Sequence, residues 1–335
     1  MAMISKIAAR VPNGGLIAFF VVMTLFFCFF ARNFATATNV ENILVGYSFI
    51  AIVALGQMFP IMARGIDLSI GSILALAGMV VFDAILIFEL PGWIAIILAI
   101  AAATLAGTLN GLFIVILSLQ PFVATLATLA GYRGLVYAIS GRQLYPELAT
   151  TPLRDPSLAW FNEYYDVGAW FGLDAFITTP WIPASFLVLL VVMVFLYVLL
   201  AKTPYGTALK ATGGNKEAAR LAGLRVRMIE VSAYAMSGFL AGIAAVLLVA
   251  RLTTSTEALG IGMELTAIAA AVIGGTRLLG GQGNVLGPVL GAFFLGVVLI
   301  GLTLMGISQF VQQMLTGAIL LAAVGYDAIR RGAGQ

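Results

Sequence analysis

Residues 65–72 place polar side chains and glycines between two long apolar runs. Their sequence, Gly-Ile-Asp-Leu-Ser-Ile-Gly-Ser, brings one carboxylate and two hydroxyls into a region where an apolar chain has few polar groups. Ionisable residues within membrane segments often mark pathways or moving parts, and glycine lets the backbone bend or approach a neighbour closely. The alternative is a helix boundary, in which Asp67 or Ser69 caps the following helix and Gly65 ends the preceding one. The residues alone leave both interpretations open.

The composition is that of a membrane protein. Of the 335 residues, 62% are hydrophobic and 9% are charged, whereas soluble domains carry roughly 25% charged residues. The apolar runs leave no stretch long enough for a soluble domain, so we expect residues 1–335 to form a single, all-α transmembrane domain embedded in a lipid bilayer. The first apolar run, 16–30, is followed by Arg32 and Asn33 rather than by a small-residue cleavage motif, and we expect it to be retained as a span.

Side chains that most enzyme chemistry requires are scarce. The chain has no histidine and one cysteine, Cys28, which removes the usual general base, the commonest metal ligand and any internal disulfide. Neither a nucleophile–base pair nor a Walker A phosphate-binding motif is found in the sequence. Basic loops account for the net charge of +3 without a nucleic-acid partner. We therefore expect a transport protein without catalytic residues, metal or cofactor, whose energy comes from another chain or from an ion gradient.

Apolar runs of about 20 residues, the length that crosses a bilayer, indicate about ten transmembrane helices. The runs are 14–32, 43–63, 67–88, 93–117, 121–140, 182–201, 228–250, 264–276, 285–305 and 309–329. The eighth is short and is followed by several glycines between 274 and 283. Its helix is expected to end inside the membrane.

Basic residues predict the orientation, because Lys and Arg accumulate in cytoplasmic loops. With a cytoplasmic N-terminus, twelve of the seventeen basic residues lie inside and four outside, while Arg133 lies within the fifth span. An odd number of spans would export Arg330 and Arg331, so both termini are predicted to be cytoplasmic. A cation within a span requires a partner, and we expect Arg133 to reach the outer surface or to pair with Asp83 or Asp67.

Two loops are longer than turns. The external loop, 141–181, carries acidic and aromatic residues, and it could form an interfacial belt or lid, or a docking surface for an external protein. The internal loop, 202–227, carries six cations, which attraction to anionic lipid would explain without a protein partner. Within it, residues 215–221 favour a short helix bounded by Gly213, Gly214 and Gly223. Such a helix is suited to a groove on another protein.

An acidic motif occurs twice in the chain. Residues 65–69 and 262–266 share the order glycine, apolar residue, acid, leucine, hydroxyl. In the predicted topology the first motif precedes a span that starts inside, and the second precedes a span that starts outside. This pattern indicates an inverted internal repeat, in which the substrate path lies near the pseudo-twofold axis at mid-membrane. A match of this length also arises by chance in a chain rich in glycine and leucine.

Residues 65–72 resemble the Gly-Ile-Asp-Leu-Ser-Val-Gly-Ser signature of the membrane subunits of monosaccharide ABC importers, the ribose, xylose and arabinose permease family. Residues 121–126, 214–223 and 264–275, with Gly280 and Gly281, are similar to that family as well. The resemblance implies a multi-pass permease of the bacterial inner membrane, paired with a second copy or a paralogue, that moves a monosaccharide by alternating access. It also implies a separate ATPase subunit that uses ATP and a periplasmic sugar-binding protein.

The same resemblance implies roles for particular residues. The signature residues expected to shape the gate are Gly65, Asp67, Ser69, Gly71 and, in the second motif, Glu264. The short cytoplasmic helix would couple the permease to its ATPase through Gly214, Asn215, Glu217, Ala218, Ala219 and Gly223. We expect Asp67 to be a hinge or capping residue that shapes the path without touching the sugar.

A neutral sugar requires hydroxyl, amide and aromatic partners that also let it leave. Candidates on the expected spans are Gln57, Asn110, Phe122, Thr125 and Thr128. Each of them could instead hold helices together, because hydroxyl and amide side chains also bond between spans.

Two other kinds of transporter stay open. One is an ABC permease for branched-chain amino acids or nucleosides, which would share the general architecture. The other is a stand-alone secondary transporter, which would require buried acids in its path, whereas Asp67, Asp83 and Glu264 are all expected near span ends.

Overall fold

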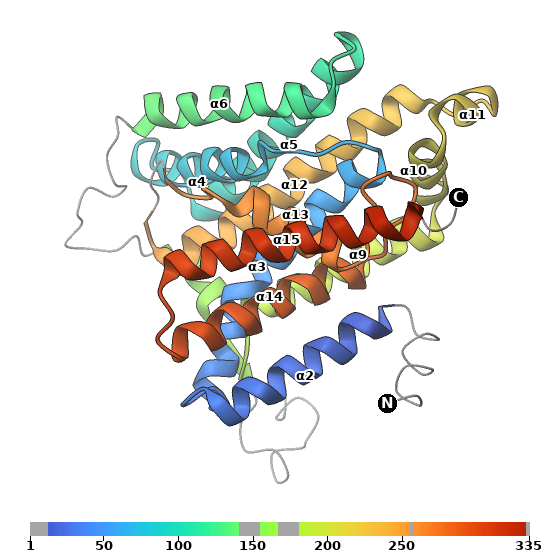
Figure 1. Cartoon of the computed structure of the whole chain (residues 1–335). Coiled ribbons are helices and arrows are strands. Elements are labelled where there is room, and N and C mark those ends of the chain that lie inside the picture. The colour runs from blue at the N-terminus through green and yellow to red at the C-terminus, as the bar shows by residue number, and fades with distance from the viewer. Residues whose placement is uncertain (1–12, 141–154, 167–180, 255–257, 333–335) are drawn as a thin grey trace.

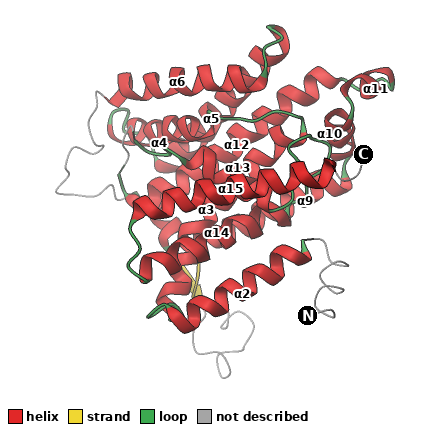
Figure 2. Ribbon diagram, in the orientation of Figure 1, coloured by secondary structure: helices red, strands yellow, loops and turns green. Residues whose placement is uncertain are grey.

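The computed structural model describes residues 13–140, 155–166, 181–254 and 258–332 (Figure 1). Most of the external loop, 141–154 and 167–180, lies outside the described residues. Helices lie side by side in a bundle, and the strands form a single short hairpin near one end of it (Figure 2). The expected helical class is confirmed.

Each of the ten predicted apolar segments overlaps one helix. These helices are α2 (Gly14–Phe30), α3 (Ala37–Met62), α4 (Ile70–Leu86), α5 (Gly92–Ile116), α6 (Pro121–Ser140), α9 (Ala184–Lys202), α12 (Val226–Leu252), α13 (Met263–Ile273), α14 (Leu286–Leu304) and α15 (Gln309–Gly332). Among the described residues, six helices are long and apolar enough to cross a membrane: α3, α5, α6, α9, α12 and α14. The apolar helices α2, α4 and α13 are shorter, so the count of ten spans stays a prediction.

The described parts of the two long loops form short elements. The external loop contributes α7 (Pro156–Ala159), η1 (Trp160–Asn162), β1 (Tyr164–Asp166) and β2 (Trp181–Pro183), with the two strands paired antiparallel. The internal loop forms α10 (Pro204–Gly214) and α11 (Lys216–Leu221). In Figure 1 the start of α2 and the end of α15 lie at the same end of the bundle as α10 and α11. That this end faces the cytoplasm stays a prediction.

The core of the bundle is built around α12, which packs against α5, α3 and α4. Glycines bring α5 and α12 into backbone contact: a Cβ at Gly107 would overlap the carbonyl oxygen of Tyr234, and a Cβ at Gly238 would overlap that of Ala103. Small residues allow such close crossings in membrane bundles. In contrast to α3 and α12, which are largely buried, α6 is mostly exposed.

The end of α3 corrects one expectation. The residue in the left-handed conformation is Arg64, with φ of 66°, and not Gly65. The backbone nitrogen of Gly65 donates to the carbonyl oxygen of Pro60 at 2.8 Å and that of Arg64 donates to Ile61 at 3.0 Å, which is the Schellman pattern of a helix end. Gly65 is required instead for space, because a Cβ there would overlap the hydroxyl of Tyr234.

Candidate functional site

The carboxylate of Asp67 lies at the centre of a buried polar network between α3 and α4. Its Oδ1 accepts hydrogen bonds from the backbone nitrogen of Ser69 at 3.0 Å, from the Ser69 hydroxyl at 2.6 Å and from Asn110 Nδ2 at 3.4 Å. Its Oδ2 accepts from the hydroxyl of Ser237 at 2.9 Å. Asn110 lies on α5 and Ser237 on α12. Asp67 therefore holds the non-helical segment against two other helices, and its side chain is fully buried.

Two further side chains hold the backbone of the same segment. With its amide oriented to satisfy both ends, Gln57 donates to the carbonyl oxygen of Asp67 and accepts from its backbone nitrogen, both at 3.1 Å. The hydroxyl of Thr125 donates to the carbonyl oxygen of Ile66 at 3.1 Å. Buried peptide groups outside secondary structure require partners of this kind. The segment is thus bonded to α3 and α6 as well.

The network extends from Ser69 to α6. Asn110 Nδ2 donates to the Ser69 hydroxyl at 2.6 Å, and the hydroxyl of Tyr132 donates to Asn110 Oδ1 at 3.2 Å. The helix-boundary interpretation is supported in a modified form: Ser69 is the N-cap of α4 but makes no side-chain capping bond, and Asp67 binds the backbone of Ser69 instead. Sequence reasoning missed Tyr132 and Ser237, because isolated hydroxyl residues on apolar helices carry no pattern that distinguishes them.

The second acidic motif lies beside Gly71, two residues after the end of the first motif. A Cβ at Gly71 would overlap the carbonyl oxygen of Gly260 and would lie 2.6 Å from Oε2 of Glu264. The local structures of the two motifs differ, however. Asp67 lies two residues before its N-cap residue, Ser69, whereas Glu264 lies two residues after its N-cap residue, Gly262. The inverted repeat stays a prediction.

The structure brings together three of the five side chains expected to line the path. Gln57, Asn110 and Thr125 are buried and bonded to the segment around Asp67. Phe122 is 55% exposed, and Thr128, partly buried on the same helix, donates its hydroxyl to the carbonyl oxygen of Thr125 at 3.2 Å. Whether these side chains contact a substrate stays a prediction.

Arg133 binds a backbone carbonyl. Its Nη1 donates to the carbonyl oxygen of Leu259 at 2.7 Å, in the loop before α13. Asp67, one of the carboxylates expected to pair with Arg133, accepts its hydrogen bonds from the hydroxyl, amide and backbone groups described above. A carbonyl partner was not anticipated, because a backbone group carries no signal in the sequence.

The expected cytoplasmic helix is present as α11. Asn215 is its N-cap, and Oδ1 accepts from the backbone nitrogen of Ala218 at 3.0 Å. Gly223 follows the helix with φ of 83°. Ala219 is buried, whereas Glu217 and Ala218 are exposed. Gly214 does not open this helix but ends α10.

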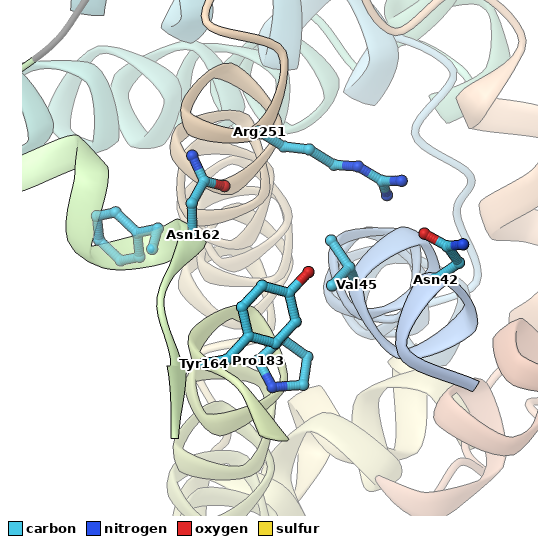
Figure 3. A pocket seen from close by; sticks show the side chains of 7 residues that line it. Asn42, Val45, Asn162, Tyr164, Pro183 and Arg251 are labelled. Carbon is cyan, nitrogen blue, oxygen red and sulfur yellow. The ribbon is translucent and has the colours of Figure 1, made fainter. Parts of the chain in front are cut away.

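A pocket of about 320 Å³ lies at the other end of the bundle, between α3, α12 and the hairpin (Figure 3). Its lining residues are Asn42, Val45, Phe161, Asn162, Tyr164, Pro183 and Arg251. The amide of Asn162 donates to the carbonyl oxygen of Ala250 at 2.6 Å and fastens η1 to the end of α12. Within the part of the chain that the structure describes, no three His, Cys, Asp or Glu side chains are grouped as metal ligands.

Comparison with known proteins identifies the family. Residues 39–324 match the family model described as "Branched-chain amino acid transport system / permease component". The chain belongs to this permease family. The ribose import permease protein RbsC of Escherichia coli (strain K12) is 35% identical to the permease over 88% of this chain and 87% of that protein. No solved structure matches the permease at a significant level.

Two other relatives from the same strain are similar over most of their length. The L-arabinose transport system permease protein AraH is 33% identical over 95% of this chain and 91% of its own. The D-allose transport system permease protein AlsC is 30% identical over 92% of this chain and 89% of its own. The resemblance first found in residues 65–72 is thereby confirmed over nearly the whole chain. The permease is an integral membrane protein and a transport component.

Proposed function

We propose that this permease moves a monosaccharide across the bacterial inner membrane as the membrane subunit of an ATP-driven importer. The observation that carries this proposal is the 30–35% identity to permeases named for ribose, L-arabinose and D-allose, which covers 88–95% of the chain. All three names are of small neutral sugars. The family description names branched-chain amino acids instead, and this is the alternative substrate class.

The proposed importer contains further subunits. The sequence has no Walker A motif, so the energy of ATP is used by a separate ATPase, which docks on α11. A periplasmic sugar-binding protein delivers the substrate at the end that carries the hairpin, and a second permease, either a copy or a paralogue, completes the pore. The exposure of Glu217 and Ala218 on α11 supports the docking of the ATPase on this helix. This chain itself binds no ATP and has no catalytic residues.

The buried network supports a path without fixed charges. The carboxylate of Asp67 is bonded to Ser69, Asn110 and Ser237, so its hydrogen-bonding capacity is directed to the protein. For contacts with the substrate we propose the neutral side chains Gln57, Asn110, Phe122, Thr125 and Thr128. Of these, Gln57, Asn110 and Thr125 are buried and would exchange their bonds to the protein for bonds to the sugar when the path opens. Weak neutral contacts allow the sugar to leave on the other side.

Uptake by whole cells tests the proposal. Cells that express the permease with its proposed ATPase and binding protein are supplied with radiolabelled D-ribose, L-arabinose, D-allose, leucine or a nucleoside. We expect saturable uptake of a sugar that is lost when the ATPase gene is deleted and that survives a protonophore while ATP is maintained. Uptake that continues after deletion of the ATPase gene but is abolished by the protonophore would identify a secondary transporter. Uptake of leucine or the nucleoside alone would contradict the sugar assignment.

A further inference from the structure

Three segments that are distant in the sequence meet through their backbones at the end of α3. We call this contact the glycine junction; it consists of Met62, Arg64, Gly213, Gly214, Gly280 and Gly281. A Cβ at Gly213 would overlap the carbonyl oxygen of Met62 and would lie 2.6 Å from the backbone nitrogen of Gly281. That nitrogen donates to the same carbonyl oxygen at 2.9 Å. The end of α10 and the loop after α13 therefore contact α3 with no side chain between them.

The side chain of Arg64 joins all three segments. Its Nε donates to the carbonyl oxygen of Gly213 at 2.6 Å and to that of Leu279 at 2.9 Å, and its Nη2 donates to the carbonyl oxygen of Gly214. The last carbonyls of a helix lack partners within it and carry the negative end of the helix dipole. The guanidinium group thus caps the end of α10 from the end of α3.

The backbone of Arg64 has a conformation that is unusual for arginine. A left-handed conformation is unfavourable for a long side chain, and glycine normally occupies this position at a helix end. Here the glycine is one residue later, and Arg64 takes the left-handed conformation. Its three carbonyl bonds supply a local reason for the arginine, because only a forked donor with several N–H groups reaches them together.

Arg64 also lies between two functional elements. It directly precedes residues 65–69, which the network around Asp67 holds. Its partner Gly214 directly precedes Asn215, the N-cap of α11. We propose that Arg64 is the positioning residue that transmits movement of α10 and α11 to residues 65–69. This inference rests on the proposed function, since it concerns the coupling of an ATPase to transport.

An ion pair also connects α11 to the bundle, independently of Arg64. Lys216 at the start of α11 pairs with Glu230 on α12, and this ion pair does not involve the glycine junction. If the Arg64 side chain is removed, α11 keeps its connection to α12 and the backbone contact at Met62 remains, but the side-chain hydrogen bonds that join the end of α10 to the residue before 65–69 are lost. ATP hydrolysis by the partner is then expected to continue while transport falls.

The test uses proteoliposomes that contain the whole complex and its binding protein. The substrate is the sugar that the whole-cell experiment identifies, and the quantity measured is the amount of sugar transported per ATP hydrolysed. Arg64→Ala removes three hydrogen bonds to carbonyl oxygens. We expect the ratio to fall at least about tenfold, which is the effect of losing a single charge-assisted hydrogen bond, with hydrolysis nearly unchanged. Arg64→Lys keeps the charge but not the fork, so we expect a fall of about threefold. The matched control is Arg277→Ala, because Arg277 lies in the loop after α13 and its side chain makes none of these contacts.

A second variant and a second readout guard against misfolding. Gly213→Ala keeps Arg64 but pushes α10 away from Met62, and we expect it to lower the same ratio. Hydrogen exchange then compares two segments: in Arg64→Ala, ATP binding to the complex should still alter exchange at 216–221 but no longer at 65–69. If the ratio is unchanged in Arg64→Ala, or if hydrolysis and uptake fall together, the proposed role of Arg64 is wrong, while the proposed function of the permease stands. A wild-type complex that transports no sugar would overturn the proposed function as well.

Discussion

The carboxylate of Asp67 and the hydroxyl of Tyr234 both act on residues 65–69. Asp67 receives hydrogen bonds from Ser69, Asn110 and Ser237. Tyr234 contacts the position of Gly65, and within the described residues its buried hydroxyl has no hydrogen-bond partner. One side chain holds the segment by bonds, whereas the other limits the space around it. The two contributions can be separated by substitution.

Substitution of Asp67 separates its hydrogen bonds from its charge. We expect Asp67→Ala to lower the stability of the detergent-solubilised permease by about 2–4 kcal/mol, because the Ser69 backbone nitrogen and its neighbours lose their buried acceptor. Asp67→Asn should cost about 1 kcal/mol, since an amide can bond to both Ser69 and Ser237. Thermal unfolding followed by intrinsic fluorescence measures both. Equal losses in the two variants would contradict the bonding role, and full transport by Asp67→Asn would show that the charge is not required.

A double-mutant cycle tests the contact between Gly65 and Tyr234. We expect Gly65→Ala to destabilise the fold by about 1–3 kcal/mol, because its Cβ overlaps the hydroxyl. Tyr234→Phe alone should be neutral or stabilising, since it removes a buried hydroxyl that lacks a partner. The double variant should regain most of the loss, which thermal unfolding of all four proteins would reveal as coupling. Additive effects would show that Gly65 is needed for another reason.

Of the two helices in the internal loop, α10 is joined to the residue that precedes 65–69, because Arg64 binds the carbonyl oxygens of Gly213 and Gly214. The end of α10 lies against α3 through glycines, and α11 is bonded to α12 by Lys216 and Glu230. With six residues, α11 is too short to be stable by itself. Its stability must come from its cap and from these contacts. Asn215 is therefore expected to control how rigid α11 is.

Removal of the cap of α11 should loosen that helix without unfolding the bundle. Asn215→Ala removes the bond to the Ala218 backbone nitrogen, a loss of about 1 kcal/mol. We expect faster hydrogen exchange at 216–221 and a lower rate of transport. The control is Arg220→Ala, which breaks an exposed ion pair with Glu217 that contributes little. Similar exchange in both variants would contradict the importance of the cap.

At the scale of the whole molecule, the two ends of the helical bundle carry different elements, and the predicted orientation assigns each end to one side of the membrane. The start of α2, the end of α15, α10 and α11 lie at one end of the bundle, and the hairpin lies near the other end (Figure 1). The accumulation of basic residues predicts that the first end is cytoplasmic. A periplasmic partner would then reach the hairpin and the pocket near Arg251, whereas an ATPase would reach α11.

Cysteine labelling tests this orientation. In a Cys28→Ser background, Glu163→Cys places a thiol beside the hairpin and Ala218→Cys places one on α11, and both positions are exposed. We expect a membrane-impermeant maleimide to label Glu163→Cys in right-side-out vesicles and Ala218→Cys only in inverted vesicles. The reverse pattern would invert the topology, and labelling of both variants from one side would show that α9, the helix between the two positions, does not cross the membrane.

The sequence by itself determined the local features of this protein. Apolar runs located ten helices, because the spacing and length of hydrophobic residues act within each segment. Residues 215–221 and Gly223 located the short helix α11 and its end, whereas Gly214, which was expected to open it, ends α10, and Asn215 is the N-cap. The signature around Asp67 indicated the family that the relatives confirm. These inferences rest on interactions between residues that are close in the chain.

The tertiary structure decided which distant groups meet. Asp67 is 43 residues from Asn110 and 170 from Ser237, and Arg64 is 149 residues from Gly213. Such pairs depend on how helices pack, and the partners are amides, hydroxyls and backbone carbonyls that occur throughout the chain. The same packing decided that Gly65 provides space for Tyr234 while Arg64 takes the left-handed turn, because a side chain at 65 would be excluded by a residue far along the sequence.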